Sequence, residues 1–304
     1  MAEIGIIIVT YNSADEIGRC LDAAISTGAE IVVVDNASAD ATVVEVKRRN
    51  VRLIANPTNR GFAAAVNQGF TVLNCTYVLL LNPDAVIQTP LDSLRVACDL
   101  PHSAGAGGLL KGQDGLPQTG FMVRSLPTVS TLALEALVLN RVWPGNPVNR
   151  RYRNIGRDYS VQSEAEQPAG AFFMVRKAVW QELDGLDERF FPLWFEDVDF
   201  CRRIRDRGYR LYFVPEAVAF HTGGHSIPRL PLELRNFYWY RSLLRYTAKH
   251  FRPAAYRVVC AAVVMGSVVR SIAESVRRFS WRPLAAYARV VRFAGRGFLF
   301  GSPG

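Results

Sequence analysis

The sequence predicts an α/β fold in which helices flank a mostly parallel central sheet and a basic, helical extension follows. Two observations predict the sheet: short apolar runs rich in β-branched residues alternate with segments of helical length, and a polar cluster follows each run. A third observation predicts the extension, because the last 68 residues carry the whole excess of positive charge.

Four apolar runs begin the predicted sheet. They occupy residues 4–9, 31–34, 51–55 and 77–81, and segments of helical length lie between them at 14–27, 39–50 and 61–74. Continuous apolar strands that alternate with helices indicate a parallel sheet covered on both faces, as in a Rossmann-like half domain. The chain begins MAEIGIIIVTYN, for which we expect a strand and not a signal peptide.

The pattern is less regular after the fourth run. We expect strands with a hairpin near residues 113–115, a loop over 140–167, a strand leading into a short helix over 169–177, a helix from Glu196 to Arg207, and strands at 210–214 and 217–220. Gly208 then follows the predicted helix at the position where a left-handed residue commonly ends one.

The composition is that of an ordinary globular protein. Apolar residues make up 49% of the 304 residues and charged residues 21%, which excludes disordered, collagen-like and coiled-coil proteins. The five cysteines are scattered and form no CxxC pair. We therefore expect neither a disulfide framework nor a cysteine zinc site, and we expect a reducing compartment.

Positive charge is concentrated near the C-terminus. Residues 237–304 hold 12 Arg and Lys residues and one acid, Glu274, whereas the first 236 residues hold 24 basic and 26 acidic residues. A uniformly basic nucleic-acid-binding protein would not show this division, so we expect no nucleic-acid partner. A near-neutral body with a basic, apolar-rich tail is typical of a protein that rests on an anionic membrane surface.

The tail allows three arrangements. Residues 233–251, 258–269 and 276–293 mix apolar residues with arginine at helical spacing. We favour interfacial helices because arginine so outnumbers acid, and the alternatives are a helical subdomain packed on the body and a membrane-spanning hairpin. The 12-residue apolar run at 258–269 is shorter than the roughly 20 residues that a spanning helix needs.

Polar residues follow each of the four predicted strands. They are Thr10, Tyr11 and Asn12, then Asp35, Asn36 and Ser38, then Asn56, Asn59, Arg60 and Gly61, and finally Asn82, Pro83 and Asp84. Any one of these clusters is commonly a helix cap or a turn. Because the carboxyl ends of parallel strands meet at one edge of a sheet, the four together predict a ligand crevice there.

Two common kinds of nucleotide site are excluded. The turn after the first strand, Thr10-Tyr11-Asn12, lacks the GxGxxG pattern of dinucleotide enzymes, and the chain has no GxxxxGK[ST] phosphate loop. A nucleotide bound at this edge would therefore need its phosphates neutralised in another way, most simply by a divalent cation on carboxylates.

Three further features suit catalysis. Asp84 follows an apolar strand and suits a hard cation, with a turn acid as the alternative. The run Trp194-Phe195-Glu196-Asp197-Val198-Asp199 places three acids at a helix start, where they supply a general base or simply complement the helix dipole. His221 ends a strand before two glycines and suits an imidazole ligand, with a structural histidine as the alternative.

These motifs, taken in order, resemble glycosyltransferase family 2. The motifs are TYN, VVDNAS, NxGF, a strand ending in NPD, GAFFMVRK, WFEDVDFCRR and HTGGHS, and they span about residues 4 to 250. They look closest to the bacterial rhamnosyltransferase-like group. The resemblance implies a GT-A fold and inverting transfer of a sugar, with L-rhamnose from dTDP-rhamnose expected, to a saccharide or lipid-linked saccharide in cell-envelope polysaccharide synthesis.

The resemblance also implies roles for individual residues. Those implied to bind the nucleotide-sugar donor are Thr10, Tyr11, Asn12, Asp35, Asn59, Gly61, Phe62, Asn67, Asn82 and Asp84. Those implied to border the acceptor are Gly170, Ala171, Trp194 and Glu196. Asp84 and His221 would hold a divalent metal, Mg²⁺ or Mn²⁺, although Asn82 stands where the family usually has aspartate. The resemblance implies that Asp197 is the catalytic base, and Glu196 is the second catalytic candidate. Because adjacent helix residues point about 100° apart, only one of the two should face the acceptor hydroxyl, and the other would bind acceptor hydroxyls or cap the helix.

We therefore expect a catalytic domain over residues 1–230, with a nucleotide-binding half (1–100) and an acceptor-binding half (101–230), and an amphipathic helical region over 231–304. The expected location is cytoplasmic, peripheral on the inner face of the cell membrane. A nucleotidyltransferase and a non-catalytic sugar-nucleotide-binding protein are the alternatives. The first usually needs a basic, glycine-rich loop where this chain has TYN.

Overall fold

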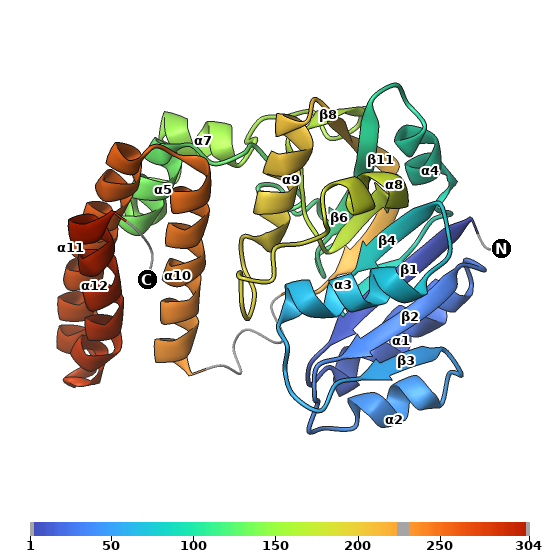
Figure 1. Cartoon of the computed structure of the whole chain (residues 1–304), viewed down its shortest axis with the longest axis horizontal. Helices are drawn as coiled ribbons and strands as arrows, with labels where there is room; N and C mark the ends of the chain where they lie inside the picture. The colour runs from blue at the N-terminus through green and yellow to red at the C-terminus, as the bar shows by residue number, and fades with distance from the viewer. Residues whose placement is uncertain (1–2, 224–230, 302–304) are drawn as a thin grey trace. The chain divides into compact units, whose positions relative to one another are not determined.

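The computed structural model describes residues 3–223 and 231–301 of a chain that divides into two compact units (Figure 1). Residues 1–126, 153–192 and 196–226 form the first unit, and residues 127–152, 193–195 and 227–304 form the second. The middle segment 127–152 thus belongs with the C-terminal helices, a grouping that the sequence pattern does not indicate.

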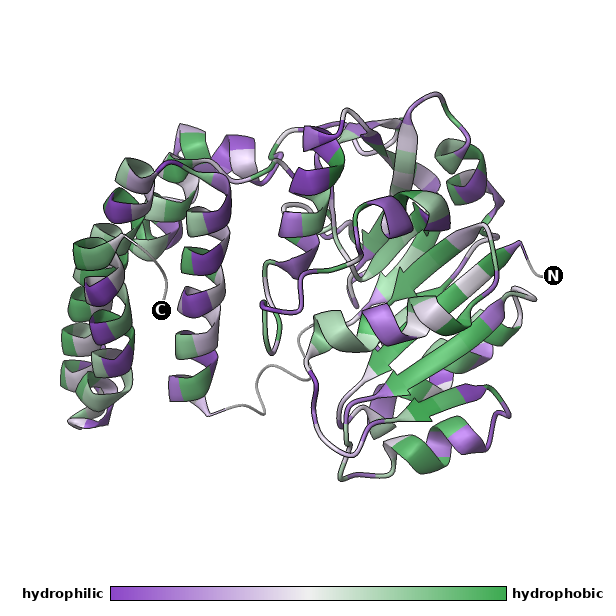
Figure 2. Cartoon of the chain, in the orientation of Figure 1, coloured by the Kyte–Doolittle hydropathy of each residue, from purple (hydrophilic) through white to green (hydrophobic). Residues whose placement is uncertain are grey.

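The first half of the central sheet contains the predicted strands. These are β1 (Ile4–Thr10), β2 (Glu30–Asp35), β3 (Arg52–Ala55) and β4 (Tyr77–Leu81), and α1 (Ala14–Ile25), α2 (Thr42–Lys47) and α3 (Phe62–Val72) alternate with them. The strands pair in parallel in the order β3-β2-β1-β4. Nearly every side chain of β1, β2 and β4 is buried, and Figure 2 shows these strands as apolar ribbons. Both faces of this half are therefore covered, as the unbroken apolar runs predict.

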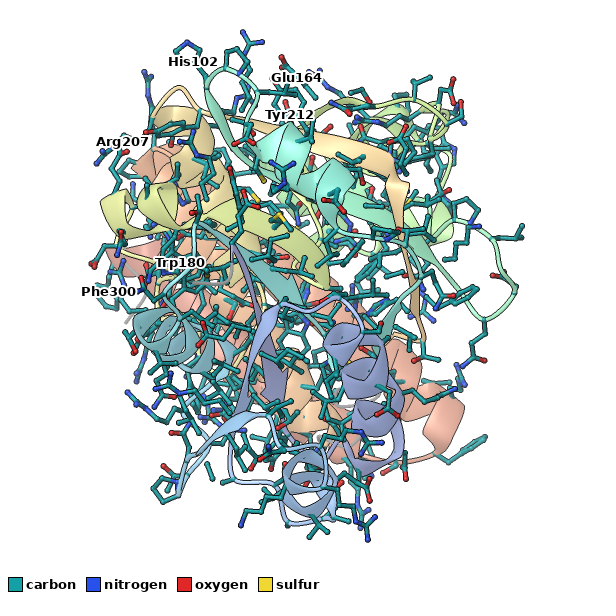
Figure 3. All side chains as sticks on the ribbon, turned by 90° about the vertical axis from the view of Figure 1, so that its right-hand side faces the viewer. His102, Glu164, Trp180, Arg207, Tyr212 and Phe300 are labelled. Atoms are coloured by element: carbon teal, nitrogen blue, oxygen red, sulfur yellow. The ribbon has the colours of Figure 1, made fainter. Side chains whose placement is uncertain are left out.

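The second half of the sheet mixes strand directions. It contains β10 (Phe172–Arg176), β6 (Ser103–Lys111), β11 (Arg210–His221), β5 (Ala85–Ile87) and β8 (Ser163–Ala165). Strand β10 is antiparallel to its neighbours β4 and β6, and β11 runs parallel to β6. Strands β5 and β8 are antiparallel to β11, and Figure 3 shows Tyr212 of β11 near its register partner Glu164 of β8. Within residues 3–223, six of the nine strands of this sheet point the same way, which confirms the predicted α/β fold.

The run at residues 105–108, in the middle of β6, is rich in glycine. The reason is that the neighbouring strand leaves no room for larger side chains. A Cβ atom on Gly105 would lie 2.3 Å from the Met174 carbonyl oxygen, and one on Gly108 would lie 2.4 Å from the Phe172 ring. Glycine usually weakens a strand, so its presence here marks the close approach of β10. The chain then turns near Gly115 and returns through a bridge between Lys111 and Pro117, which is the hairpin expected there.

Three helices and a small sheet complete the first unit. They are α4 (Asp92–Cys98), α8 (Lys177–Glu182) and α9 (Glu196–Asp206), with β7 (Val123–Arg124) paired to β9 (Gln167–Pro168). Helix α9 begins at the predicted residue, and Gly208 beyond its end has a φ of +82°. Strand β11 is one strand of 12 residues rather than two runs, with a register shift between Val214 and Val218.

The expectation of a loop over residues 140–167 is wrong in part. The segment contains the end of α6 (Leu139–Val142), all of α7 (Pro147–Tyr152) and strand β8. The Asn146 carboxamide oxygen accepts the backbone N–H of Asn149 at 2.9 Å, and Pro147 occupies the first helical position. Asparagine before proline is thus a helix start here, although the same pair also marks turns.

The second unit is helical, as predicted for the C-terminal extension. Its long helices are α10 (Leu232–His250), α11 (Pro253–Arg278) and α12 (Arg282–Phe300), and α5 (Val129–Ala136) packs with them. Two glycines allow close packing: a Cβ atom on Gly266 would lie 1.9 Å from the Ala136 carbonyl oxygen, and one on Gly297 would lie 2.3 Å from the Tyr256 hydroxyl. The guanidinium of Arg289 lies 3.9 Å from the centre of the Phe237 ring, which adds a cation–π contact.

Candidate active site

The ends of β1 and β2 are joined through the buried carboxylate of Asp35. The Thr10 hydroxyl donates to Asp35 Oδ1 at 2.7 Å, and Ser38 donates its backbone N–H to Oδ2 at 2.9 Å. Ser38 in turn accepts the backbone N–H of Asn12 at 2.8 Å. Thr10, Asn12 and Asp35 therefore lie together at the carboxyl edge of the sheet, and the half-buried Tyr11 lies between the first two in the chain.

The third polar cluster shapes the start of α3. Gly61 has a φ of +85°, and a Cβ atom there would lie 2.8 Å from the Phe191 ring. The Asn59 carboxamide accepts the Gly61 N–H at 2.9 Å, and the Phe62 N–H donates to the Pro192 carbonyl at 2.7 Å. Only glycine suits this position, because it combines left-handed backbone with a crowded neighbour.

Asn67 occupies a different environment from the other donor candidates. Its carboxamide donates to the Leu186 carbonyl at 2.9 Å and accepts the Leu186 N–H at 3.0 Å. It also donates to the Glu188 carboxylate at 3.0 Å. The side chain thus ties α3 to the turn that follows α8.

Asp84 and His221 meet where β5 pairs with the end of β11. Ala85 is the register partner of His221, which brings Asp84 Oδ1 to 3.5 Å from His221 Nε2. Both side chains are buried, and Asp84 Oδ2 accepts the Gly223 N–H at 2.8 Å. The Asn82 carboxamide nitrogen lies 3.4 Å from the same His221 Nε2. Residues far apart in the chain therefore form one polar cluster.

Gln118 fixes the orientation of His221, although no motif in the sequence singles Gln118 out. Its amide nitrogen donates to the His221 carbonyl at 2.7 Å, so its amide oxygen is the atom 2.9 Å from His221 Nδ1. Since an amide oxygen can only accept, Nδ1 carries the proton of the neutral ring and Nε2, on the side of Asp84, does not. Phe121 stacks on the imidazole with ring centres 5.1 Å apart.

The three acids at the start of α9 have three different environments. Asp199 is fully buried and pairs with Arg203 at 2.8 Å, which makes it a structural ion pair. Glu196 is buried, and within the described residues its Oε2 has no hydrogen-bond partner. Burial raises the pKa of Glu196 well above its ordinary value, and the neighbouring Asp197 charge raises it further.

Asp197 is held closer to its ionised form than Glu196. Burial raises its pKa, but the Val198 N–H, the positive charge of Arg124 and the Gly170 backbone each lower it. The Val198 N–H donates to Asp197 Oδ1 at 2.8 Å. A Cβ atom on Gly170 would lie 3.8 Å from Asp197 Oδ2, an ordinary contact distance, so Gly170 lies directly beside this carboxylate.

Gly170 and Ala171 link the chain segment of Asp84 to the acids at the start of α9. Gly170 lies against Asp197, and the next residue, Ala171, accepts the Asn82 N–H through its carbonyl at 3.0 Å. The antiparallel direction of β10 places its first residues at the same sheet edge as the last residues of β4. The structure therefore brings Asn82, Gly170, Ala171 and Asp197 together.

Trp194 belongs to the second unit, unlike the other candidates. Its backbone has a φ of +77°, and Phe195 follows with a φ of +70°. Two consecutive bulky residues in the left-handed region are unusual and often occur near functional sites.

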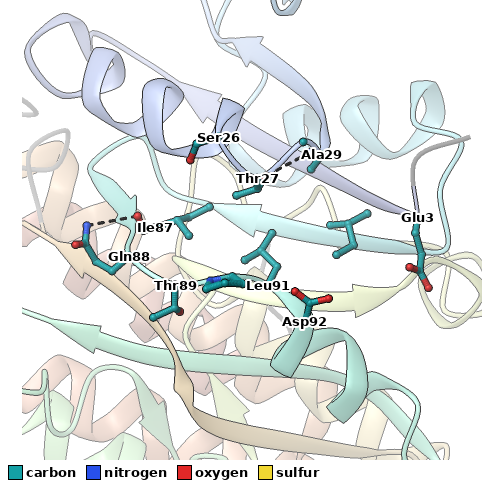
Figure 4. Close-up of a pocket in the computed structure, with 12 residues that line it drawn as sticks. Glu3, Ser26, Thr27, Ala29, Ile87, Gln88, Thr89, Leu91 and Asp92 are labelled. Atoms are coloured by element: carbon teal, nitrogen blue, oxygen red, sulfur yellow. Dashed lines mark hydrogen bonds between the residues drawn. The ribbon is translucent and has the colours of Figure 1, made fainter.

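A pocket of about 510 Å³ lies at the other end of the sheet (Figure 4). Its lining includes Glu3 and Ile4 at the start of β1, residues 26–29 after α1, and residues 87–92 after β5. It contains none of the predicted site residues, and it does not lie at the carboxyl edge where the polar clusters meet.

Comparison with known proteins identifies a family match and named relatives. The model of glycosyl transferase family 2 matches residues 5–93. The chain is 33% identical over 197 residues to the rhamnosyltransferase WbbL of Escherichia coli K12, which covers 63% of this chain and 69% of that protein. It is 28% identical over 283 residues to the N-acetylglucosaminyl-diphospho-decaprenol L-rhamnosyltransferase of Mycobacterium tuberculosis, covering 80% and 88%.

Solved glycosyltransferase structures share the fold. A mannosyltransferase of Pyrobaculum calidifontis, solved with GDP-mannose and Mn²⁺, aligns over 98% of this chain and 87% of its own at a TM-score of 0.54 and 16% identity. GalNAc-T7, solved with UDP, GalNAc and Mn²⁺, aligns over 81% of this chain and 48% of its own at a TM-score of 0.57 and 15% identity. These similarities confirm the GT-A fold.

Replacing Gln118 should change the tautomer of His221. In the wild type we expect His221 to carry its proton on Nδ1. The ¹⁵N NMR signals of histidine-labelled protein report which ring nitrogen is protonated. The variant His221→Asn shows which of the signals of the four histidines belongs to His221. Gln118→Leu should shift the proton toward Nε2, where Asp84 can accept it, whereas Gln118→Glu should retain the wild-type tautomer because its carboxylate also accepts. A wild-type ring protonated on Nε2 would refute this orientation.

Proposed function

The chain belongs to glycosyl transferase family 2, and we propose that it transfers L-rhamnose from dTDP-rhamnose, with inversion at the anomeric carbon, to a lipid-linked saccharide. The observation that carries the proposal is that Asp84 lies beside His221, and Gly170 beside Asp197, at the sheet edge where the Asn82 N–H donates to the Ala171 carbonyl. Both named relatives given above are rhamnosyltransferases, and the name of one specifies an acceptor on a decaprenol diphosphate. We therefore propose a role in cell-envelope polysaccharide synthesis.

Thr10, Tyr11, Asn12 and Asp35 are proposed to bind the base and ribose of the donor. Asp35 supports this role because hydrogen bonds from Thr10 and Ser38 hold its carboxylate rigidly at the strand end. A carboxylate can accept the ring N–H of a thymine base. Asn59, Gly61 and Phe62 are proposed to line the same pocket, because they follow β3 at the same edge of the sheet.

Asp84 and His221 are proposed to hold a divalent cation, Mg²⁺ or Mn²⁺. The residues fit such an ion, because a carboxylate oxygen and an unprotonated imidazole nitrogen lie 3.5 Å apart and both are common ligands. Within the described residues no group of three or more His, Cys, Asp and Glu side chains forms a complete metal site. Asn82 contributes a neutral amide where a second carboxylate would be usual, and His225 lies outside the described residues. When bound, the cation would neutralise charge that develops on the leaving diphosphate.

Asp197 is proposed to accept the proton of the acceptor hydroxyl as the general base. A base must be ionised at the working pH. The pKa of Glu196 is raised well above its ordinary value, whereas at Asp197 backbone N–H groups and the charge of Arg124 offset part of the rise that burial causes. Glu196 is proposed to border the acceptor together with Gly170, Ala171 and Trp194. A single carboxylate is sufficient for a single displacement with inversion, so the two neighbouring acids have separate roles.

The protein is proposed to act on the cytoplasmic side, peripherally on the cell membrane, because its acceptor is lipid-linked and residues 237–304 carry a charge of +11. Among the described residues one helical stretch, Pro253–Arg277, is long and apolar enough to cross a membrane by length and composition. Helices in the core of soluble proteins pass the same test, and 39% of its apolar window is buried within the structure.

Asp84→Asn should remove metal-dependent donor binding. We expect the affinity for dTDP measured by calorimetry to rise when Mg²⁺ or Mn²⁺ is added to the wild type, and the variant to lose that gain together with turnover. Asp92→Asn, in the pocket at the other end of the sheet, is the matched control and should behave as the wild type. Full activity of the wild type in excess EDTA would contradict the metal role.

Asp197→Asn should lower the transfer rate by about 10²–10⁴-fold, the usual contribution of a positioned base, while leaving donor affinity unchanged. Glu196→Gln should lower the transfer rate less, because we assign Glu196 to binding of the acceptor and not to the proton transfer. Single-turnover kinetics with saturating donor measures both rates. The reverse ranking would assign the base to Glu196.

Arg124→Gln should move the acid limb of the pH–rate profile to higher pH. The positive charge of Arg124 lowers the pKa of Asp197, so its loss raises that pKa and the base becomes protonated at a higher pH. The profile of kcat/KM against pH measures the shift. Arg205→Gln removes a charge that pairs with Glu166 and should leave the limb in place; a limb that Arg124→Gln leaves unmoved would exclude Asp197 as the titrating base.

A further inference from the structure

An apolar stripe runs along the exposed face of α11. Its five members are Val258 (55% exposed), Met265 (56%), Val269 (62%), Ile272 (55%) and Val276 (68%). Their spacings of seven, four, three and four residues place them on one side of the helix over about 27 Å. Exposed apolar side chains are common singly, but a continuous row of them marks an interaction surface.

The opposite face of α11 already has its partners within the second unit. Tyr256, Val259 and Val263 are buried, and Gly266 lies against the backbone of α5. Helix α11 also packs along α12. The fold therefore uses one face of the helix, and no contact of this unit described for residues 127–152, 193–195 and 231–301 requires the stripe to be apolar.

Two aromatic residues extend the stripe at the turn between α11 and α12. Phe279 is 97% exposed and Trp281 is 83% exposed. Phe279 ends α11 in the left-handed region with a φ of +48°. Aromatic side chains of this kind are enriched where a protein meets the boundary between lipid headgroups and acyl chains.

The charges around the stripe have one sign. Exposed arginines stand next to both of its ends, with Arg257 beside Val258 and Arg277 beside Val276. The single acid of residues 237–304, Glu274, is half-buried and accepts a hydrogen bond from the Tyr287 hydroxyl at 3.1 Å. Arginine can lay its apolar stem on an acyl surface while its guanidinium reaches lipid phosphates.

We propose that the α11 stripe, with Phe279 and Trp281, is the surface by which this protein lies in the interface of an anionic bilayer. The charge complementarity favours anionic lipid over a second copy of the chain, which would bring like charges together. The helix lies in the plane of the membrane and does not cross it, because its inner face is committed to α5 and α12. The proposal rests on the proposed function, since a lipid-linked acceptor requires the enzyme to work at a membrane.

Tryptophan quenching by vesicles tests this surface on the full chain. Vesicles of phosphatidylglycerol and phosphatidylcholine with brominated acyl chains should quench part of the emission, and Trp281→Phe should abolish that quenching without abolishing binding. The double variant Val269→Ser, Ile272→Ser should weaken flotation with the same vesicles by about tenfold or more. Val44→Ser, Val96→Ser is the matched control, because both valines are exposed in the first unit.

Each outcome decides for or against the surface. Three results would overturn the proposal. The first two are equal binding to purely neutral vesicles and binding without quenching. The third is a dimer that the wild type forms without vesicles and that the variant Val269→Ser, Ile272→Ser does not form. Transfer of rhamnose to a lipid-free acceptor analogue should be unchanged in that variant. If the wild type binds and quenches as expected but transfers no rhamnose, the proposed function fails while the surface stands.

Discussion

The candidate site depends on one antiparallel strand inserted in a mostly parallel sheet. Because β10 runs against β4, its first residues lie beside the last residues of β4, and the hydrogen bond from the Asn82 N–H to the Ala171 carbonyl joins the two at 3.0 Å. The pairing of β5 with β11 then brings His221 to Asp84. Without this arrangement, the residues proposed for the metal and for the base would not share one edge of the sheet. The glycines of β6 follow from the same constraint, since β10 packs too closely against them for side chains.

The three acids at the start of α9 look alike in the sequence but have different electrostatic environments in the structure. Asp199 is neutralised by Arg203, Glu196 is buried with an unpartnered oxygen among the described residues, and Asp197 is supported by backbone N–H groups and the charge of Arg124. Three neighbouring carboxylates thus become an ion pair, a group whose pKa burial raises well above its ordinary value, and a group in which backbone N–H groups and Arg124 offset part of that rise. Part of the difference arises from Arg124 and Gly170, which are distant from Asp197 in the chain, and it suits an enzyme that needs one proton acceptor.

The first half of the fold could be predicted because its signals are local. Unbroken apolar runs specify β1 to β4, and the polar residues after each run could be placed at one edge by the geometry of parallel strands alone. Gln118 and Arg124 could not be predicted, because they lie in an irregular segment and their partners, His221 and Asp197, are distant in the sequence. Helix α7 was missed because asparagine before proline starts helices as well as turns. The apolar stripe of α11 became visible only when its packed face was known.

Asp84 and His221 are proposed to hold the cation that binds the donor diphosphate. Electron spin echo envelope modulation of Mn²⁺ bound with dTDP to the full protein can detect this ligation, because a coordinated imidazole nitrogen modulates the echo of the metal. We expect ¹⁴N modulation in the wild type that disappears in His221→Asn, although dTDP remains bound. Modulation that persists in His221→Asn, or its absence from the wild-type complex, would rule out His221 as a ligand of the cation.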